Sequence, residues 1–523
     1  DGIALTPPAE TGEDFDASIK RTDFVILAAI AAVAAAVVLQ LGSRIEPGLG
    51  LGIDDYSVAV LPLVEVGATA DQRYFALGMQ ASLIAALSQV QRVRVTSKVS
   101  TMQYGENADL SLKDIGRALN VSKVIEGLVT RRGNQVSIAV QLFDAREDRN
   151  LWSATFEDEL DNINFLQSRI ALEVANQIKV DVTDADRARL TNAKSVNPEA
   201  YLAFLRGVFH VERYNPEDMQ IAQGHFQRAI EIDPEYAQGY WGLAKLCAFM
   251  GQAGVLTPDE ARAQCRPPLE RALELDPFLP EAYLGMASFL TWQDFDFEAA
   301  RPQFERAIEL NPSYAEAHMF YSHYLGIIGE LDKSTEHMQT ALELDPLNPF
   351  LMGLHSIQLC MIGDYEAAVD AAEASVAAPG VAFGYITLQL ANNELGNYDE
   401  AVEALANSFE FIGGNPEVAA ATRALYAELG YEGMSLALAE QMEAVAATEH
   451  VPPIIIGSLY YQSGDVENAV AWFRRAYERS DPDSPYLGVN VKDPRVRAHP
   501  DFQALLREMG LDYWADEAST HSP

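Results

Sequence analysis

The pattern of apolar residues changes along the chain and divides it into three parts. From residue 198 onward, apolar and small residues recur at helical spacing in units of about 34 residues. Between residues 56 and 182, short β-branched runs alternate with helical patterns, which predicts a small α/β domain. Nearer the start, Phe24–Leu41 is apolar except for Gln40 and carries no charge. We therefore expect an α+β multidomain protein with one transmembrane helix, a small α/β domain and an all-α repeat solenoid.

Four similar strings in the second half of the chain each close with a proline. AIEIDP, ALELDP, AIELNP and ALELDP end at Pro234, Pro277, Pro312 and Pro346. Small residues stand where the two helices of a unit would cross, and glycine stands in the tight turns between them. This pattern resembles the tetratricopeptide repeat, a helix pair of about 34 residues. Eight units are expected, at 198–234, 235–277, 278–312, 313–346, 347–380, 381–416, 417–452 and 453–485.

The segment before the repeats alternates strands and helices. Strands are expected at 57–64, 92–96, 123–130, 135–143 and 151–156, and helices at 71–88, from 111, and at 163–180. The strings VAVLPL, YFALGMQASLIAALSQ, VRVTSKVS, IGRALNVSKVIEGLV, VSIAVQLFDA and NLW follow one another in this segment. They resemble the TolB-like N-terminal domain that precedes tetratricopeptide repeats in bacterial inner-membrane proteins. The closing string DPRVRAHPDFQALLREMGL also resembles the terminal cap of that family.

This resemblance implies a mixed sheet flanked by helices, on the periplasmic side of a single-span anchor. The cytoplasmic half of such proteins is commonly a winged-helix DNA-binding domain, a class III nucleotide cyclase or a protein kinase. None of these three domains is recognisable in this chain. The expected location is the bacterial inner membrane, with the N-terminus in the cytoplasm and the bulk of the chain in the periplasm.

The apolar run near the start is long enough to cross a bilayer as a helix. Lys20 and Arg21 precede it and only Arg44 follows it closely, so the positive-inside rule puts the N-terminus in the cytoplasm. A cleaved signal peptide and a buried helix of a soluble protein are the alternatives. The expected parts are a cytoplasmic linker at 1–22, a transmembrane helix at 23–42, a linker at 43–55, the TolB-like α/β domain at 56–182, the repeat solenoid at 183–485, and a C-terminal cap and tail at 486–523.

Charge and motifs narrow the function. The chain has 37 basic and 76 acidic residues, a formal charge of -39, which repels nucleic acid. It contains no nucleophile elbow, zinc-protease motif or phosphate loop, so no catalytic residue, cofactor or metal is expected. Three cysteines form no CxxC pair. Cys247 and Cys265 fall at facing positions of one helix pair, which leaves a disulfide bridge and two buried thiols both open.

The concave face of the solenoid is the candidate binding site, because the first helix of each pair lines it. The expected partner-binding groove consists of Trp241, Lys245, Phe249, Leu284, Trp292, Met319, His323, Ile327, Phe350, Ile357 and Met361. If these apolar side chains are exposed, they suit an amphipathic or apolar peptide. Changing Trp241 or Trp292 to Ala is then expected to weaken partner capture and leave the fold intact. The alternative is a groove filled by neighbouring repeats or by another segment of this chain.

These patterns favour a non-enzymatic, membrane-anchored periplasmic protein that binds a protein or peptide partner as a scaffold or sensor. One alternative is the extracytoplasmic regulatory part of a class III adenylate or guanylate cyclase, or of a winged-helix transcription regulator. A structural subunit of a larger membrane complex is another. Assembly with further copies of the chain remains open.

Overall fold

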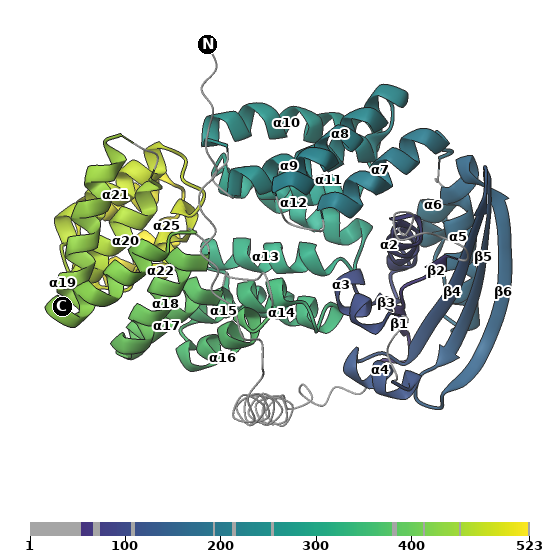
Figure 1. Ribbon diagram of the computed structural model, residues 1–523, viewed down its shortest axis with the longest axis horizontal. Coiled ribbons are helices and arrows are strands. Elements are labelled where there is room, and N and C mark those ends of the chain that lie inside the picture. The colour runs from purple at the N-terminus through teal and green to yellow at the C-terminus, as the bar shows by residue number, and fades with distance from the viewer. Residues whose placement is uncertain are drawn as a thin grey trace, which may run out of the picture. The chain divides into compact units, whose positions relative to one another are not determined.

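The computed structural model describes residues 54–65, 74–105, 110–191, 194–211, 216–252, 256–378, 384–411, 414–448 and 451–520. All of them belong to one compact unit that begins at Asp54 (Figure 1). The expected membrane helix at 23–42 lies outside the described residues. Within the described ranges, no helix is both long and apolar enough to cross a membrane. The described unit is mostly helical, with a small sheet region at its N-terminal end.

The sheet region is a mixed sheet in the order β3-β1-β4-β5-β6, with β2 paired to β4. Its strands are β1 Ser57–Val60, β2 Val64–Glu65, β3 Arg94–Val95, β4 Lys123–Arg132, β5 Gln135–Asp144 and β6 Arg149–Glu159. Its helices are α2 Tyr74–Ser88, α3 Lys98–Thr101, α4 Leu112–Ala118, α5 Ile163–Gln177 and α6 Asp184–Thr191, with short 3-10 turns η2 Met102–Tyr104 and η3 Leu160–Asn162. β1 runs parallel to β3 and β4, whereas β4, β5 and β6 are antiparallel.

The two faces of the sheet differ because side chains alternate along each strand. Val136, Ile138, Val140 and Leu142 of β5 are buried in the core shared with α2 and α5. The intervening residues point to the other face, where Gln141 is exposed. α4 covers that face only near β1, through a smaller cluster. A hairpin turn follows β4, where Gly133 takes a φ of 64° that favours glycine.

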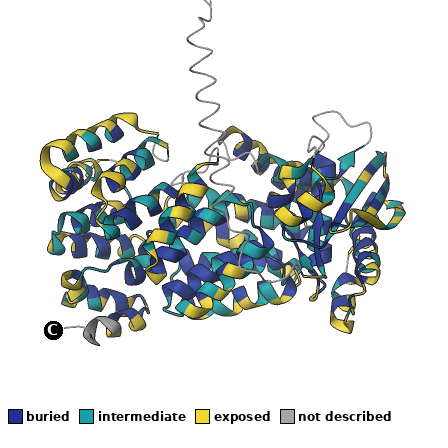
Figure 2. Cartoon of the chain, turned by 90° about the horizontal axis from the view of Figure 1, so that it is seen from below, coloured by how far each residue is buried: buried dark blue, intermediate teal, exposed yellow. Residues whose placement is uncertain are grey.

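The helical region is a series of antiparallel helix pairs. These are α7 Pro198–Val211 with α8 Pro216–Ile232, α9 Ala237–Gln252 with α10 Pro258–Leu275, α11 Pro280–Trp292 with α12 Phe297–Leu310, α13 Ala315–Ile327 with α14 Leu331–Leu344, α15 Pro349–Ile362 with α16 Tyr365–Val376, α17 Gly384–Leu395 with α18 Tyr398–Phe411, the two halves of α19 Pro416–Ala446, and α20 Pro453–Ser463 with α21 Val466–Glu478. Gly430 has non-helical backbone angles and divides α19. Buried residues lie where helices face one another (Figure 2).

The sheet region is joined to the repeats through the turns that end two of them. Ser313, in the turn after α12, accepts a hydrogen bond from Val95 N of β3 at 3.2 Å. Ser100, on α3, donates to the Asp345 carboxylate at 2.6 Å and accepts from Leu347 N at 2.9 Å. Edge strand β3 is therefore covered by the repeats, and the two parts pack as one unit. The proline-closed strings thus end the helices and also supply the polar turns of this joint.

Candidate functional site: the inner face of the repeats

Most of the expected groove residues are not exposed. Six of the eleven are at most 8% exposed, namely Leu284, Trp292, Met319, His323, Ile327 and Met361. Trp241, Phe249, Phe350 and Ile357 are half-buried, and Lys245 is exposed. The expectation of a continuous exposed apolar groove is therefore wrong for the central repeats. A segment of this chain fills the groove at His323 and Ile327, whereas Met319 is buried by the neighbouring repeats, in a cluster with Met338 and Leu351.

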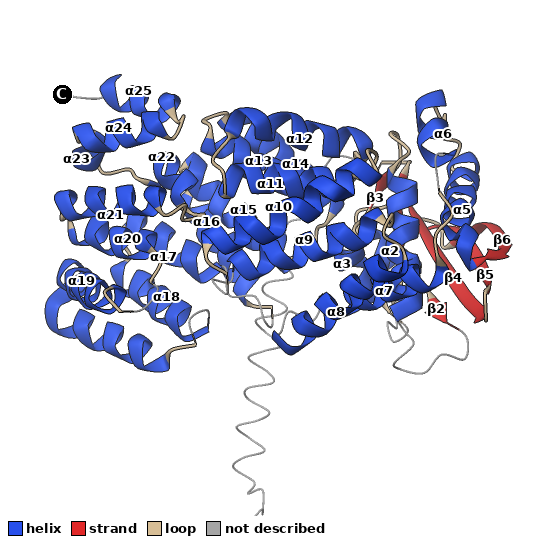
Figure 3. Ribbon diagram, turned by 90° about the horizontal axis from the view of Figure 1, so that it is seen from above, coloured by secondary structure: helices blue, strands red, loops and turns tan. Residues whose placement is uncertain are grey.

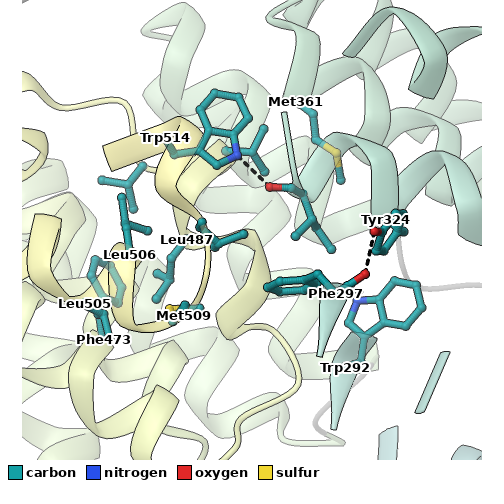
Figure 4. Packing of buried hydrophobic residues seen from close by; sticks show 14 of the residues in the cluster. Trp292, Phe297, Tyr324, Met361, Phe473, Leu487, Leu505, Leu506, Met509 and Trp514 are labelled. Carbon is teal, nitrogen blue, oxygen red and sulfur yellow. Dashed lines mark hydrogen bonds between the residues drawn. The ribbon is translucent and has the colours of Figure 1, made fainter. Parts of the chain in front are cut away.

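The filling comes from the C-terminal end, which we call the closing segment, residues 484–515. It contains η4 Ser484–Tyr486, α22 Leu487–Asn490, α23 Pro494–Arg497, α24 Pro500–Glu508 and most of α25 Asp512–Thr520. Trp514 is 3% exposed, and its indole N–H donates to the Ile327 carbonyl at 2.7 Å, beside Met361 (Figure 4). Trp514 and Ala515, which were expected in the cap and tail, are therefore part of the core.

A second attachment involves a buried histidine of α13. His323 lies 2.9 Å from the Leu354 carbonyl through Nε2 and 3.0 Å from the Tyr486 hydroxyl through Nδ1. Because a carbonyl only accepts, Nε2 carries the proton, and Nδ1 accepts from Tyr486. Burial lowers the pKa of His323 to about 4. The neutral imidazole thus connects α13, α15 and the closing segment.

The expected cap string has two roles in the structure. Its helix α24 packs on the last repeat, where the Phe473 and Phe502 rings lie 6.2 Å apart. Arg497, in α23, donates to the Gly488 carbonyl at 2.6 Å and to the Trp514 carbonyl at 3.3 Å. Arg497 therefore connects the segment before the cap string, at Gly488, with the segment after it, at Trp514.

The last repeat also contacts early ones. Arg262 of α10 donates to the Ser480 hydroxyl at 3.1 Å and to the Gln293 carbonyl at 2.8 Å. The Phe295 and Tyr477 rings stack with centroids 5.8 Å apart. These contacts bring the end of α21 against the turn between α11 and α12. In Figure 3, α23, α24 and α25 lie beside α21, and α22 lies between them and the central helices.

One end of the predicted groove keeps an accessible strip on α9. Trp241, Lys245 and Phe249 follow one another at intervals of four residues, on one helix face. The Lys245 ammonium lies 5.5 Å from the Trp241 ring centroid and 3.9 Å from the Glu316 carboxylate. Burial raises the pKa of nearby Glu281 to about 7, and its Oε2 has no hydrogen-bond partner among the described residues. We call Trp241, Lys245 and Phe249 the α9 strip.

The cysteines of the second repeat are bridged. Cys247 of α9 and Cys265 of α10 form a disulfide with their Cα atoms 5.4 Å apart. Burial raises the pKa of the remaining thiol, Cys360, to about 12. Within the described residues, no group of three or more histidine, cysteine or carboxylate side chains is placed to hold a metal ion.

The residues that close the groove were not expected from the sequence. Tyr486, Leu487, Val489 and Trp514 stand just outside the cap string, in what was expected to be a cap and tail. Their apolar character was the available signal, because a solvated tail has no need of a tryptophan and several β-branched or leucine residues.

Comparison with known proteins identifies the repeats. The tetratricopeptide repeat family model matches residues 292–349 and 454–485, which contain α12 to α14 and α20 to α21. The chain therefore contains tetratricopeptide repeats, and the prediction from the proline-closed strings is confirmed. Such repeats are a non-enzymatic fold that commonly binds proteins.

One curated relative is a putative adenylate cyclase 3 from Rhizobium meliloti (strain 1021), 30% identical over 206 residues. The match covers 39% of this chain and 35% of the relative, so the chain spans about a third of that relative's length.

Solved structures with similar folds include PilW, a widely conserved type IV pilus biogenesis factor, and pilF of Pseudomonas aeruginosa. PilW is 14% identical, covers 43% of this chain and 99% of its own, and has a TM-score of 0.34. pilF is 15% identical, covers 44% and 97%, and has a TM-score of 0.32. Scores at this level carry no argument about the function of this chain.

Trp292 is buried and Trp241 is only half-buried, so the two substitutions should differ in their effect on stability. Trp292→Ala is expected to lower the free energy of unfolding by about 3–5 kcal/mol, because it opens a cavity beside Phe304 and Phe320. Trp241→Ala, at a half-buried position, should cost less than about 2 kcal/mol. Urea unfolding of the two variants tests this order. Equal and small losses would contradict the filled groove.

Acid should loosen the closing segment before it unfolds the protein. The folded-state pKa of His323 is about 4, below the ordinary histidine pKa of 6.5. The unfolded chain therefore binds the proton first, and stability present above pH 6.5 is lost as the pH falls toward 4, by at most about 3 kcal/mol. Amide hydrogen exchange of residues 486–491 is expected to rise between pH 7 and pH 5.

A matched variant isolates this contact. His323→Gln should flatten the pH dependence of exchange in residues 486–491, because glutamine does not titrate. His355→Gln on α15 removes an imidazole whose pKa is also about 4 but which does not hold Tyr486, and it should leave that dependence unchanged. Equal effects of both variants would show that His323 has no special role.

Proposed function

We propose that this chain is the extracytoplasmic scaffold of a single-pass membrane protein and that it binds a protein partner at the α9 strip. The apolar run Phe24–Leu41 serves as the anchor in this proposal, with Lys20 and Arg21 on the cytoplasmic side. The mixed sheet with α2 and α5 on one face supports the resemblance to the TolB-like domain of bacterial inner-membrane proteins.

The observation that carries this proposal is the Cys247–Cys265 disulfide. Structural disulfides persist in oxidising compartments such as the periplasm and are rare in the cytosol. The bridge joins the two helices of the repeat that presents the α9 strip, and 18 residues separate the cysteines in the sequence. It therefore fixes α9 against α10 at the place where the partner would bind.

The partner site is proposed at the α9 strip because the filled centre of the groove leaves little else of it accessible. A tryptophan and a phenylalanine at intervals of four residues suit the apolar face of an amphipathic helix. Glu281 and Glu316 lie near Lys245, so the surroundings favour a partner segment that also carries a basic side chain. Phe350 and Ile357, which are half-buried, pack on a cluster of the central repeats around Met319 and are not part of the proposed site.

The relative from Rhizobium meliloti favours a second candidate. In that reading the chain is the regulatory part of a nucleotide cyclase or another signalling protein, and the catalytic domain lies outside these residues. The scaffold would then transmit partner binding at the α9 strip to that catalytic domain. A structural subunit of a membrane complex is the remaining alternative.

Thiol labelling in cells tests the compartment. Cells are quenched with strong acid, which protonates thiols and stops disulfide exchange, and the full chain is then denatured. Without reductant, a thiol-reactive mass tag should label one cysteine, Cys360, and after reduction it should label three. Protease added to spheroplasts should digest the repeats. Three reactive thiols without reductant, together with repeats that resist external protease, would overturn the extracytoplasmic location.

Photo-crosslinking tests the partner site. A photoreactive amino acid at Lys245 in the full chain should give an adduct with a second polypeptide, and the same residue at exposed Arg228 of α8 should not. Trp241→Ala should reduce the Lys245 adduct at least about fivefold without unfolding the protein. Adducts of equal yield from both positions, or none from Lys245, would move the binding site elsewhere.

A further inference from the structure

The sheet has one open edge. Its order places β3 and β6 at the two edges, and the repeats cover β3 through Ser313. β6 lies on the opposite side, away from the repeats (Figures 1 and 3). This edge strand has 11 residues, RNLWSATFEDE, with no proline and no lysine. Proteins usually protect such edges, because their outer N–H and C=O groups are a template for another strand.

The sequence of β6 is complementary to itself when reversed. Around Ala154, Trp152 stands opposite Phe156, and Ser153 opposite Thr155. Further out, Arg149 at one end is matched by the acidic end Glu157–Glu159 at the other. An antiparallel pair of two such strands therefore places aromatic beside aromatic, hydroxyl beside hydroxyl and base beside acid. Each of these cross-strand pairs is stabilising.

We propose that two copies of this chain associate through β6, antiparallel and centred on Ala154, so that the two sheets become one continuous sheet. Trp152 and Phe156 are half-buried on the face toward α5, with ring centroids 6.0 Å apart. The same pair from the second copy would extend this cluster across the edge. Ser153 and Thr155 are exposed on the other face and would meet their counterparts there.

Two local features limit the pairing to the middle of the strand. A bulge opposite Leu142 and Phe143 disturbs the start of β6. At its end, Arg169 donates to the Glu157 carbonyl at 3.2 Å and lies 3.5 Å from the Asp158 carboxylate. The stretch from Trp152 to Phe156 is free of both features. The charged ends then act as long-range partners that set the antiparallel direction.

The distribution of charge agrees with this surface. Residues 183–523 hold 21 basic and 52 acidic residues, whereas residues 54–182 hold 13 and 17. Two copies that met through their repeats would repel one another strongly. Pairing through β6 joins the nearly neutral domains and keeps the acidic repeats on opposite sides. The proposal does not depend on the membrane topology or on the α9 strip.

Molar mass measurements on the full chain in detergent micelles test the association. The wild-type chain should form a dimer that dissociates on dilution. Thr155→Lys puts a charge on the open edge at an exposed position and should leave a monomer. Arg149→Glu should raise the dimer dissociation constant about two- to fivefold, because the charged ends of the two strands then repel at long range. Arg149→Glu combined with Glu159→Arg should restore the dimer.

A cysteine at the proposed symmetry axis tests the geometry. Ala154→Cys should be crosslinked between two copies by a short bis-maleimide, since directly opposed Cβ atoms lie about 5 Å apart. Ser137→Cys, on neighbouring strand β5, should not be crosslinked. A wild-type chain that stays monomeric up to about 100 μM would overturn the proposal. A dimer that persists in Thr155→Lys would also overturn the proposal. So would the finding that β6 binds a different protein, which Thr155→Lys releases.

Discussion

The arrangement of the whole repeat array depends on covering the apolar side chains of its inner face. A tetratricopeptide helix pair buries one side against its neighbours and leaves the concave side to be solvated or occupied. Here Trp292, Ile327 and Met361 would be an exposed apolar surface, and the closing segment packs in the same buried cluster with them. Because the cover comes from the same chain, its effective concentration at the groove is high.

The polar contacts of the closing segment decide where the cover sits. Apolar packing alone is not directional, but the Trp514 indole and the Tyr486 hydroxyl each have a single acceptor in the groove. An unpartnered buried N–H or O–H costs about 1–3 kcal/mol, so a shifted register of the segment is disfavoured. The same contacts make the cover sensitive to the protonation of His323. The joint at Ser100 and Asp345 follows the same logic, because its buried hydroxyl and carboxylate fix how the α/β domain packs on the repeats.

Local pattern was enough to predict most elements and not enough to predict what fills the groove. The expected strand at 135–143 is Gln135–Asp144 in the structure, and the expected helix at 71–88 is Tyr74–Ser88. These follow from side-chain periodicity and turn residues within a few positions of one another. The contact of Trp514 with Ile327 spans 187 residues and has no periodic signature. For the same reason, the repeat pattern could not reveal that His323 meets Tyr486 or that Met319 is buried between neighbouring helices, so the exposure of both residues was misjudged.

Filling the centre of the groove leaves two other surfaces as the candidates for binding. The α9 strip lies in the second helix pair, next to a disulfide that stiffens it. β6 lies on the far edge of the sheet, where the backbone itself offers hydrogen bonds. The two surfaces differ in chemistry. The α9 strip would recognise the side chains of a partner, whereas β6 would recognise the backbone of an extended strand. The two surfaces are connected through α2, which packs between the sheet and α7. The packing is tight, because a Cβ atom added at Gly78 of α2 would lie 2.5 Å from the Leu205 side chain of α7. A rigid connection of this kind would allow one scaffold to bind a partner at the α9 strip and a second copy at β6 at the same time.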